Sequence, residues 1–187
     1  KIKNFFFGET KKKRAYHNRQ NMLQLVWNSW IEGGLKNSLH SKVRIEPAMK
    51  TKIDALEHPW NILYREKRAL ASYPPLKQPT MLELFNRANG SLLILGEPGS
   101  GKTTMLLELC RQAIERAKED LLQPIPVVFN LSSLKPEPEK RPEQAFSDWL
   151  VSELKNRYSV PIKIGRPWVD NDALLLLLDG LDELPDE

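Results

Sequence analysis

The chain has 187 residues, of which 41% are hydrophobic and 28% are charged. This balance is typical of a folded globular protein of about one domain, and it excludes a disordered chain or a collagen-like repeat. The longest apolar run, 173–178, has six residues, whereas a membrane-spanning helix requires roughly 20. Cys110 is the single cysteine and has no partner for an internal disulfide, so we expect a reducing, cytoplasmic compartment.

Charge is distributed unevenly along the chain, whose formal net charge is +4. Residues 1–20 hold seven basic side chains and one acidic side chain, a local charge of +6, so the remaining residues sum to −2. The basic run Lys11–Arg14 is suited to the phosphates of nucleic acid or to anionic lipid headgroups. A solvated linker is the simpler interpretation. The sequence starts without Met and stops within an acidic cluster, so we expect it to be a piece of a longer protein. In the membrane alternative, Phe5–Phe7 would be the end of a membrane segment that precedes Lys1.

The region before residue 80 predicts one helix and a connector. Apolar side chains recur at helical spacing on one face across residues 18–40; they are Leu23, Val26, Trp27, Trp30 and Ile31. Gly33 and Gly34 should weaken this helix. Residues 41–79 contain five prolines and no clear period, so we expect an irregular connector with one helical turn near residues 62–71. We therefore divide the chain into a basic tail (1–20), a helical lead-in with a proline-rich connector (21–79) and a domain over 80–187.

Residues 80–119 predict a helix, a strand and a second helix. Thr80 and Glu83 have the spacing of a capping box, which would begin a helix over 81–88. The apolar run 91–95 lies between glycines and predicts a buried parallel strand. Residues 102–119 predict an amphipathic helix. Its apolar stripe is Leu106, Cys110, Ala113, Ile114 and Ala117, which makes Cys110 a core residue.

The rest of the chain continues this alternation. We expect a strand at 125–130, a surface loop at 131–142, and a helix with Pro142 in its first turn. The buried face of that helix would consist of Phe146, Trp149, Leu150, Leu154 and Tyr158. Residues 160–172 predict another loop and 173–178 a last strand. Alternating helices and strands predict an α/β fold whose parallel sheet is flanked by helices, with ligands bound beyond the carboxyl ends of the strands.

A glycine-rich motif joins the first predicted strand to the next helix. Gly-Glu-Pro-Gly-Ser-Gly-Lys-Thr at 96–103 fits the phosphate-binding pattern G-x-x-x-x-G-K-T, and its position opens a helix as that chemistry requires. Main-chain N–H groups would bind phosphate, Lys102 would reach the β- and γ-phosphates, and the Thr103 hydroxyl would ligate Mg²⁺. The expected nucleotide-binding residues are Gly96, Glu97, Pro98, Gly99, Ser100, Gly101, Lys102, Thr103 and Thr104.

The last predicted strand ends in acidic residues. Its five leucines, 174–178, predict burial on both faces, and Asp179 follows directly at the ligand edge of the sheet. We expect Asp179 to hold Mg²⁺, usually through a water molecule. Asp182 and Glu183 are candidates to orient or deprotonate an attacking water. The expected catalytic residues are therefore Asp182, Glu183 and Lys102.

These two motifs together carry a family resemblance. The motif at 96–104 and the ending Leu-Leu-Asp-Gly-Leu-Asp-Glu-Leu at 177–184 resemble a NACHT domain, which belongs to the signal-transduction ATPases with numerous domains (STAND). The distinguishing mark is a small residue after the metal-binding aspartate, followed by two more acids; here these are Gly180, Asp182 and Glu183. The resemblance covers residues 80–187. The helix around Trp27 and Trp30 is similar to the lead-in of bacterial, especially cyanobacterial-type, members.

The resemblance implies a P-loop NTPase domain with a three-layer αβα sandwich, incomplete at its C-terminus and preceded by a helical segment. It also implies binding of ATP, or GTP in some members, with slow Mg²⁺-dependent hydrolysis that operates a signalling switch. Self-association through this domain is implied for the longer protein, and bacterial members are often linked to defence against phage. We call the motif at 96–104 the cradle. In the family, a strand from later in the chain lies between the strand before the cradle, here 91–95, and the strand that ends at the acidic residues, here 173–178. We therefore expect a gap between these two strands.

Two other functions remain open from the residues. A GTPase-like or kinase-like P-loop enzyme shares the cradle; however, Asp182 stands where the Asp-x-x-Gly of Ras-type GTPases has glycine, and no Asn-Lys-x-Asp occurs. A binding scaffold would hold nucleotide without hydrolysing it and would contact nucleic acid or a membrane through residues 1–20. His17, His40 and His58 lack the spacing of zinc ligands, so we infer no zinc site.

Overall fold

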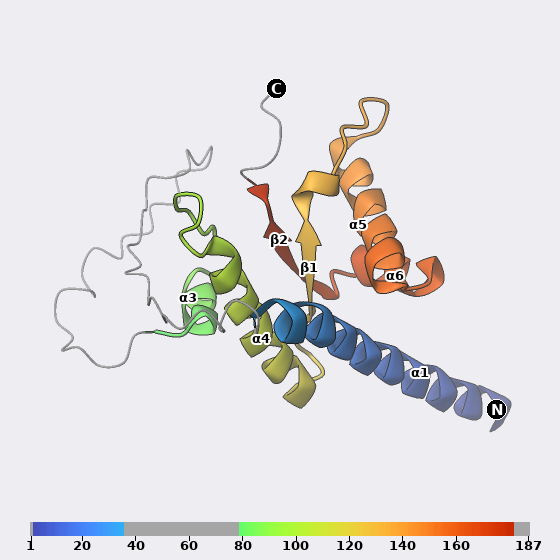
Figure 1. Cartoon of the computed structure of the whole chain (residues 1–187). Helices are drawn as coiled ribbons and strands as arrows, with labels where there is room; N and C mark the ends of the chain where they lie inside the picture. The colour runs from blue at the N-terminus through green and yellow to red at the C-terminus, as the bar shows by residue number, and fades with distance from the viewer. Residues whose placement is uncertain (1, 36–78, 182–187) are drawn as a thin grey trace.

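The computed structural model describes residues 2–35 and 79–181 (Figure 1). The helical turn predicted near residues 62–71 lies outside these ranges, as do His40, His58 and the catalytic candidates Asp182 and Glu183.

The chain begins with a long helix, α1 (Ile2–Val26), which continues into a π-helical segment, η1 (Trp27–Leu35). Residues 2–20, interpreted above as a linker, belong to this helix. The basic run contains no proline, and lysine and arginine are good helix formers, so a helix anchored by packing further along can extend through it. The predicted apolar face is confirmed: Leu23, Val26 and Ile31 are buried and the two tryptophans pack against the core, together with Met22.

A parallel two-stranded sheet lies at the centre of the molecule. Strand β1 (Ile125–Asn130) pairs with β2 (Leu174–Asp179), so that Asn130 and Asp179 are opposite one another at the carboxyl ends. Helices α3 (Met81–Arg87) and α4 (Lys102–Glu119) lie on one side of this sheet, and α5 (Pro142–Tyr158) and α6 (Ile162–Asp170) lie on the other (Figure 1). A short 3-10 turn, η2 (Leu131–Ser133), follows β1.

Several local predictions are confirmed. Helix α4 has the expected bounds, and β1 agrees with the predicted strand. Thr80 and Glu83 form the complete capping box at the start of α3, each bonding the other's backbone N–H. Cys110 is fully buried, and this burial raises the pKa of its thiol to about 12. Among the described residues, no helix is both long and apolar enough to cross a membrane.

The predicted strand at 91–95 is not formed. This segment has no regular secondary structure, and Leu92, Leu93 and Leu95 are 38%, 40% and 54% exposed. The expected burial of β2 on both faces is also wrong, because Leu177 is its single buried residue and Leu178 is 37% exposed. A strand is stabilised by a hydrogen-bonded neighbour. In the described part of the chain the sheet consists of β1 and β2 alone. The segment 91–95 therefore pairs with no strand there, and the edge of β2 that faces away from β1 is unpaired.

The loop predicted at 160–172 is also wrong, because most of it forms α6. Gly165 and Pro167 concealed this helix in the sequence, since both residues disfavour helix interiors. Packing against α5 explains why the helix forms: a Cβ atom on Gly165 would lie 3.2 Å from Leu154 Cδ1, a close approach that glycine permits. Trp168 and Val169 add apolar contacts with the core. Tertiary packing therefore overrides the local signal.

Candidate functional site

The glycine-rich segment 96–101 forms a loop that leads into the N-terminus of α4. Gly99 and Gly101 have φ angles of 77° and 90°, in the left-handed region that glycine adopts without strain. Gly101 is the N-cap, and the first helical bond runs from Met105 N–H to the Gly101 carbonyl at 2.9 Å. The amides of Thr103 and Thr104 therefore lie in the first turn, where N–H groups point out of the helix toward an anion.

The loop closes upon itself through Lys102. Its ammonium group donates to the Gly96 carbonyl at 2.9 Å and to the Glu97 carbonyl at 3.4 Å. Ser100 N–H also donates to Glu97 O, at 3.1 Å. A Cβ atom on Gly96 would meet the Ser100 hydroxyl, which would have to rotate away, and would lie 3.2 Å from Ser100 Cβ. Gly96 therefore gives the Ser100 side chain its place inside the loop, and the Lys102 ammonium group lies against the carbonyls at the start of the loop.

The cradle and the acidic strand meet at one point. Thr103, in the first turn of α4, donates its hydroxyl hydrogen to Asp179, at the end of β2, with oxygen distances of 3.0 Å and 3.2 Å. Both strand arrows point toward the end of the molecule that holds the loop before α4 (Figure 1). Two residues that are 76 positions apart in the sequence are thus in contact, as the rule for carboxyl ends of parallel strands leads one to expect.

The donor atoms of this pair fit a magnesium ion. The Thr103 hydroxyl and the nearer Asp179 oxygen are joined by a hydrogen bond of 3.0 Å, so both oxygens face the same small space. One ion there would be held by Thr103 directly and by Asp179 through a water molecule. A hydroxyl and a carboxylate are also the hard oxygen donors that magnesium prefers. Gly180 follows with a φ of 80°, so the chain turns away immediately beyond the carboxylate.

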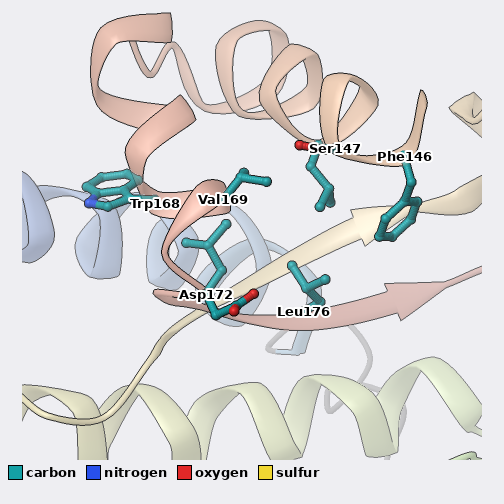
Figure 2. A pocket seen from close by; sticks show the side chains of 8 residues that line it. Phe146, Ser147, Trp168, Val169, Asp172 and Leu176 are labelled. Atoms are coloured by element: carbon teal, nitrogen blue, oxygen red, sulfur yellow. The ribbon is translucent and has the colours of Figure 1, made fainter. Parts of the chain in front are cut away.

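Two cavities of the described structure lie away from this site. Figure 2 shows a cavity of about 240 Å³ between β2 and the helices α5 and α6, lined by residues such as Phe146, Trp168 and Asp172. A second, of about 330 Å³, lies between α3, α4 and β2, near Phe85 and Leu175. No cradle residue lines either of them. Residues 96–100 of the candidate site are exposed, so the loop is accessible to a ligand from solvent. No motif in the sequence pointed to these two cavities.

The opposite end of α4 is held by a residue whose role the sequence analysis missed. The Arg19 guanidinium donates to the carbonyls of Ala117 and Asp120 at 3.0 Å and 3.4 Å, where the helix carries its negative end. Burial lowers the pKa of Arg19, and the Asp120 charge opposes this effect. A signal existed: Arg19 stands three and four positions before Met22 and Leu23, on the face that α1 buries.

Comparison with known families adds to this geometry. The family model of the NACHT domain matches residues 91–187, which is 97 of the 187 residues. The chain belongs to the NACHT family. Its NACHT domain is a nucleotide-binding P-loop NTPase of the STAND type. The cradle and Asp179 lie within the matched range, whereas α1, η1 and α3 precede it. No curated protein and no solved structure matches the chain.

Proposed function

We propose that this NACHT domain binds ATP with Mg²⁺ at the cradle and hydrolyses it slowly as the switch of a signal-transduction protein. The observation that carries the proposal is the contact between Thr103 and Asp179. This contact supports one shared ion, because Thr103 of the cradle and Asp179 of β2 are both expected to ligate Mg²⁺ and lie side by side. GTP is the alternative nucleotide, since the described residues include no site that we can assign to a base.

The remaining roles follow from charge and position. Lys102, whose ammonium group is 2.9 Å from the Gly96 carbonyl, would exchange that neutral acceptor for phosphate oxygens. The Mg²⁺ ion would neutralise charge on the phosphates when bound. Thr103 and Asp179 would hold the ion, and the backbone N–H groups of residues 99–103 would donate to the phosphates, whereas Pro98 has no N–H.

Hydrolysis itself would depend on acids beyond the described residues. We propose that Asp182 and Glu183 orient or deprotonate the attacking water, because carboxylates near the γ-phosphate can act as a general base. Steady-state ATP turnover tests this directly. Turnover lost in Asp182→Asn and Glu183→Gln, with ATP binding retained, supports a hydrolysing switch; unchanged turnover in both contradicts it, and no turnover in the unaltered protein favours a binding scaffold.

We propose that the NTPase domain spans residues 80–187. Helix α3 begins at the Thr80 cap and connects to α4 through a bond from Leu82 N–H to Gln112 Oε1 at 2.9 Å. The lead-in helix packs on this domain through α4 and β1. We also propose, from the family resemblance, that the domain self-associates and that the protein serves in defence.

Isothermal titration tests nucleotide binding. We expect the chain to bind ATP with Mg²⁺, and Lys102→Ala to weaken this binding by about 10- to 100-fold, since a hydrogen bond to a charged group contributes about 1.5–3 kcal/mol. Lys163→Ala, which removes an exposed lysine of α6, is the matched control and should bind as the unaltered chain does. Equal affinity for Lys102→Ala would reject the proposal, and competition with GTP would decide the base.

A further inference from the structure

One stretch of α1 stands apart from the body of the protein. Residues 10–17 are all exposed, whereas Met22 and Leu23, less than two turns further along, are buried. Figure 1 shows α1 extending away from the sheet and its helices toward the N-terminus. The exposed stretch spans about 12 Å along the helix axis. Solvent reaches every side of it, and we call it the projection.

Four consecutive basic residues encircle the projection. Successive side chains of a helix are about 100° apart, so Lys11–Arg14 point in four directions around the axis. We call these four residues the basic collar. None of them forms a hydrogen bond or an ion pair with another described residue, and residues 10–17 include no acid. The charge of the collar is therefore accessible to an external anion.

The arrangement of these charges fits a groove better than a flat surface. A planar anionic surface contacts one side of a helix, so it would leave part of the collar facing away. The major groove of B-form DNA is about 12 Å wide and admits an α-helix, whose diameter with side chains is about 10–12 Å. Because the collar surrounds its helix, basic side chains would face both phosphate walls of the groove at any rotation about the axis.

We propose that the basic collar binds double-stranded DNA in its major groove, mainly through the phosphates. The side chains beside the collar favour DNA over a bilayer, since among residues 10–17 Tyr16 is the single large side chain that could enter an apolar layer. Binding there leaves the cradle free. The projection leads to Arg19 at the carboxyl end of α4, whereas the cradle lies at the amino end of that helix.

Fluorescence anisotropy of the 187-residue chain with a labelled DNA duplex tests the site. We expect binding that weakens steeply with salt, because each neutralised phosphate releases counterions. The variant K11Q/K12Q/K13Q keeps good helix formers. If two of its three lysines contact phosphates, it should lower the salt slope by about 2 and weaken binding by about 50- to 100-fold near 0.1 M salt.

Two control variants separate charge at the collar from other effects. K11R/K12R/K13R keeps the charge, so it should bind like the unaltered chain. K135Q/K155Q/K163Q removes three exposed lysines of the body and should also bind like the unaltered chain. Circular dichroism should show the same helix content in all three variants. Equal losses in K11Q/K12Q/K13Q and K135Q/K155Q/K163Q would overturn the proposal, as would the absence of DNA binding by the unaltered chain.

Two further ligands test the groove and the class of partner. The major groove of duplex RNA is deep and too narrow to admit side chains, so an RNA duplex of the same length should bind about tenfold more weakly or less well still. Equal affinity for the two duplexes would overturn docking in the groove. Tight binding to vesicles with about 30% phosphatidylserine, without DNA binding, would overturn the proposal in favour of a membrane site.

Discussion

The two ends of α4 differ in almost every physical respect. The amino end begins at a glycine N-cap without a side-chain cap, and Thr103 and Thr104 there are exposed. The carboxyl end is packed under α1 and η1: Ala117 is fully buried, Arg19 bonds the last carbonyls, and Lys118 lies 4.8 Å from the Trp27 ring. The exposed amino end of α4 is therefore accessible to a ligand, whereas its packed carboxyl end contributes to stability.

The segment η1, which packs on the carboxyl end of α4, is itself tied to the sheet. Trp30 Nε1 donates to the Tyr158 hydroxyl at 2.8 Å, and that hydroxyl donates to the Val128 carbonyl at 2.5 Å. This chain of bonds connects η1, α5 and β1. Burial raises the pKa of Tyr158 above its ordinary value, so the phenol stays protonated and keeps its donor role. Substitutions at the two ends of α4 should therefore have separate consequences.

The largest expected effect on stability comes from the buried face of α1. Leu23→Ala should lower the free energy of unfolding by about 2–5 kcal/mol, because Leu23 is fully buried and a cavity would remain. Urea denaturation followed by circular dichroism measures this loss. Leu25→Ala, on the exposed face of the same helix at 41% exposure, is the control and should cost far less. Equal losses would show that α1 does not hold the carboxyl end of α4.

A smaller effect is expected at the bonded chain. Tyr158→Phe removes the acceptor of the Trp30 bond and leaves the buried Val128 carbonyl without its donor, at a cost of about 1–3 kcal/mol. The melting temperature should fall, while ATP affinity of the folded protein should not change. Tyr16→Phe, which alters an exposed tyrosine of α1, should leave both unchanged. An altered ATP affinity in Tyr158→Phe would show that the packing around the carboxyl end of α4 affects binding at its amino end.

The smallest effect concerns the cap of α3. Thr80→Ala removes the side-chain acceptor for Glu83 N–H and should lower the free energy of unfolding by about 1 kcal/mol. Thr80→Ser keeps the hydroxyl and should retain most of this stability, as measured in the same urea titration. If both variants lost equal stability, the capping box would not be what stabilises this helix.

Local signals in the sequence were sufficient for α3, α4 and β1, because a capping box, an amphipathic stripe and a short apolar run each act over a few residues. The strand at 91–95 could not be predicted in the same way, since a strand requires a neighbour that sequence position does not supply. Helix α6 depends on contacts with α5 that outweigh Gly165 and Pro167.

The candidate site was more predictable than the fold around it. The positive φ angles of Gly99 and Gly101 agree with the motif, and Asp179 lies at the predicted carboxyl end of its strand. Asp179 reaches Thr103 even though the segment 91–95 before the loop forms no strand. The role of Arg19 was harder to predict. Its charge suggested that it belonged to the exposed basic run, although its spacing from Met22 and Leu23 puts it on the buried face of α1.

The most direct test of one shared ion is a double-mutant cycle on ATP affinity, with Thr103→Val, Asp179→Asn and the pair, titrated with and without Mg²⁺. If both residues hold the same magnesium, the losses should be non-additive by about 0.5–3 kcal/mol with Mg²⁺, and this coupling should vanish without it. Additive losses in the presence of Mg²⁺ would contradict the account.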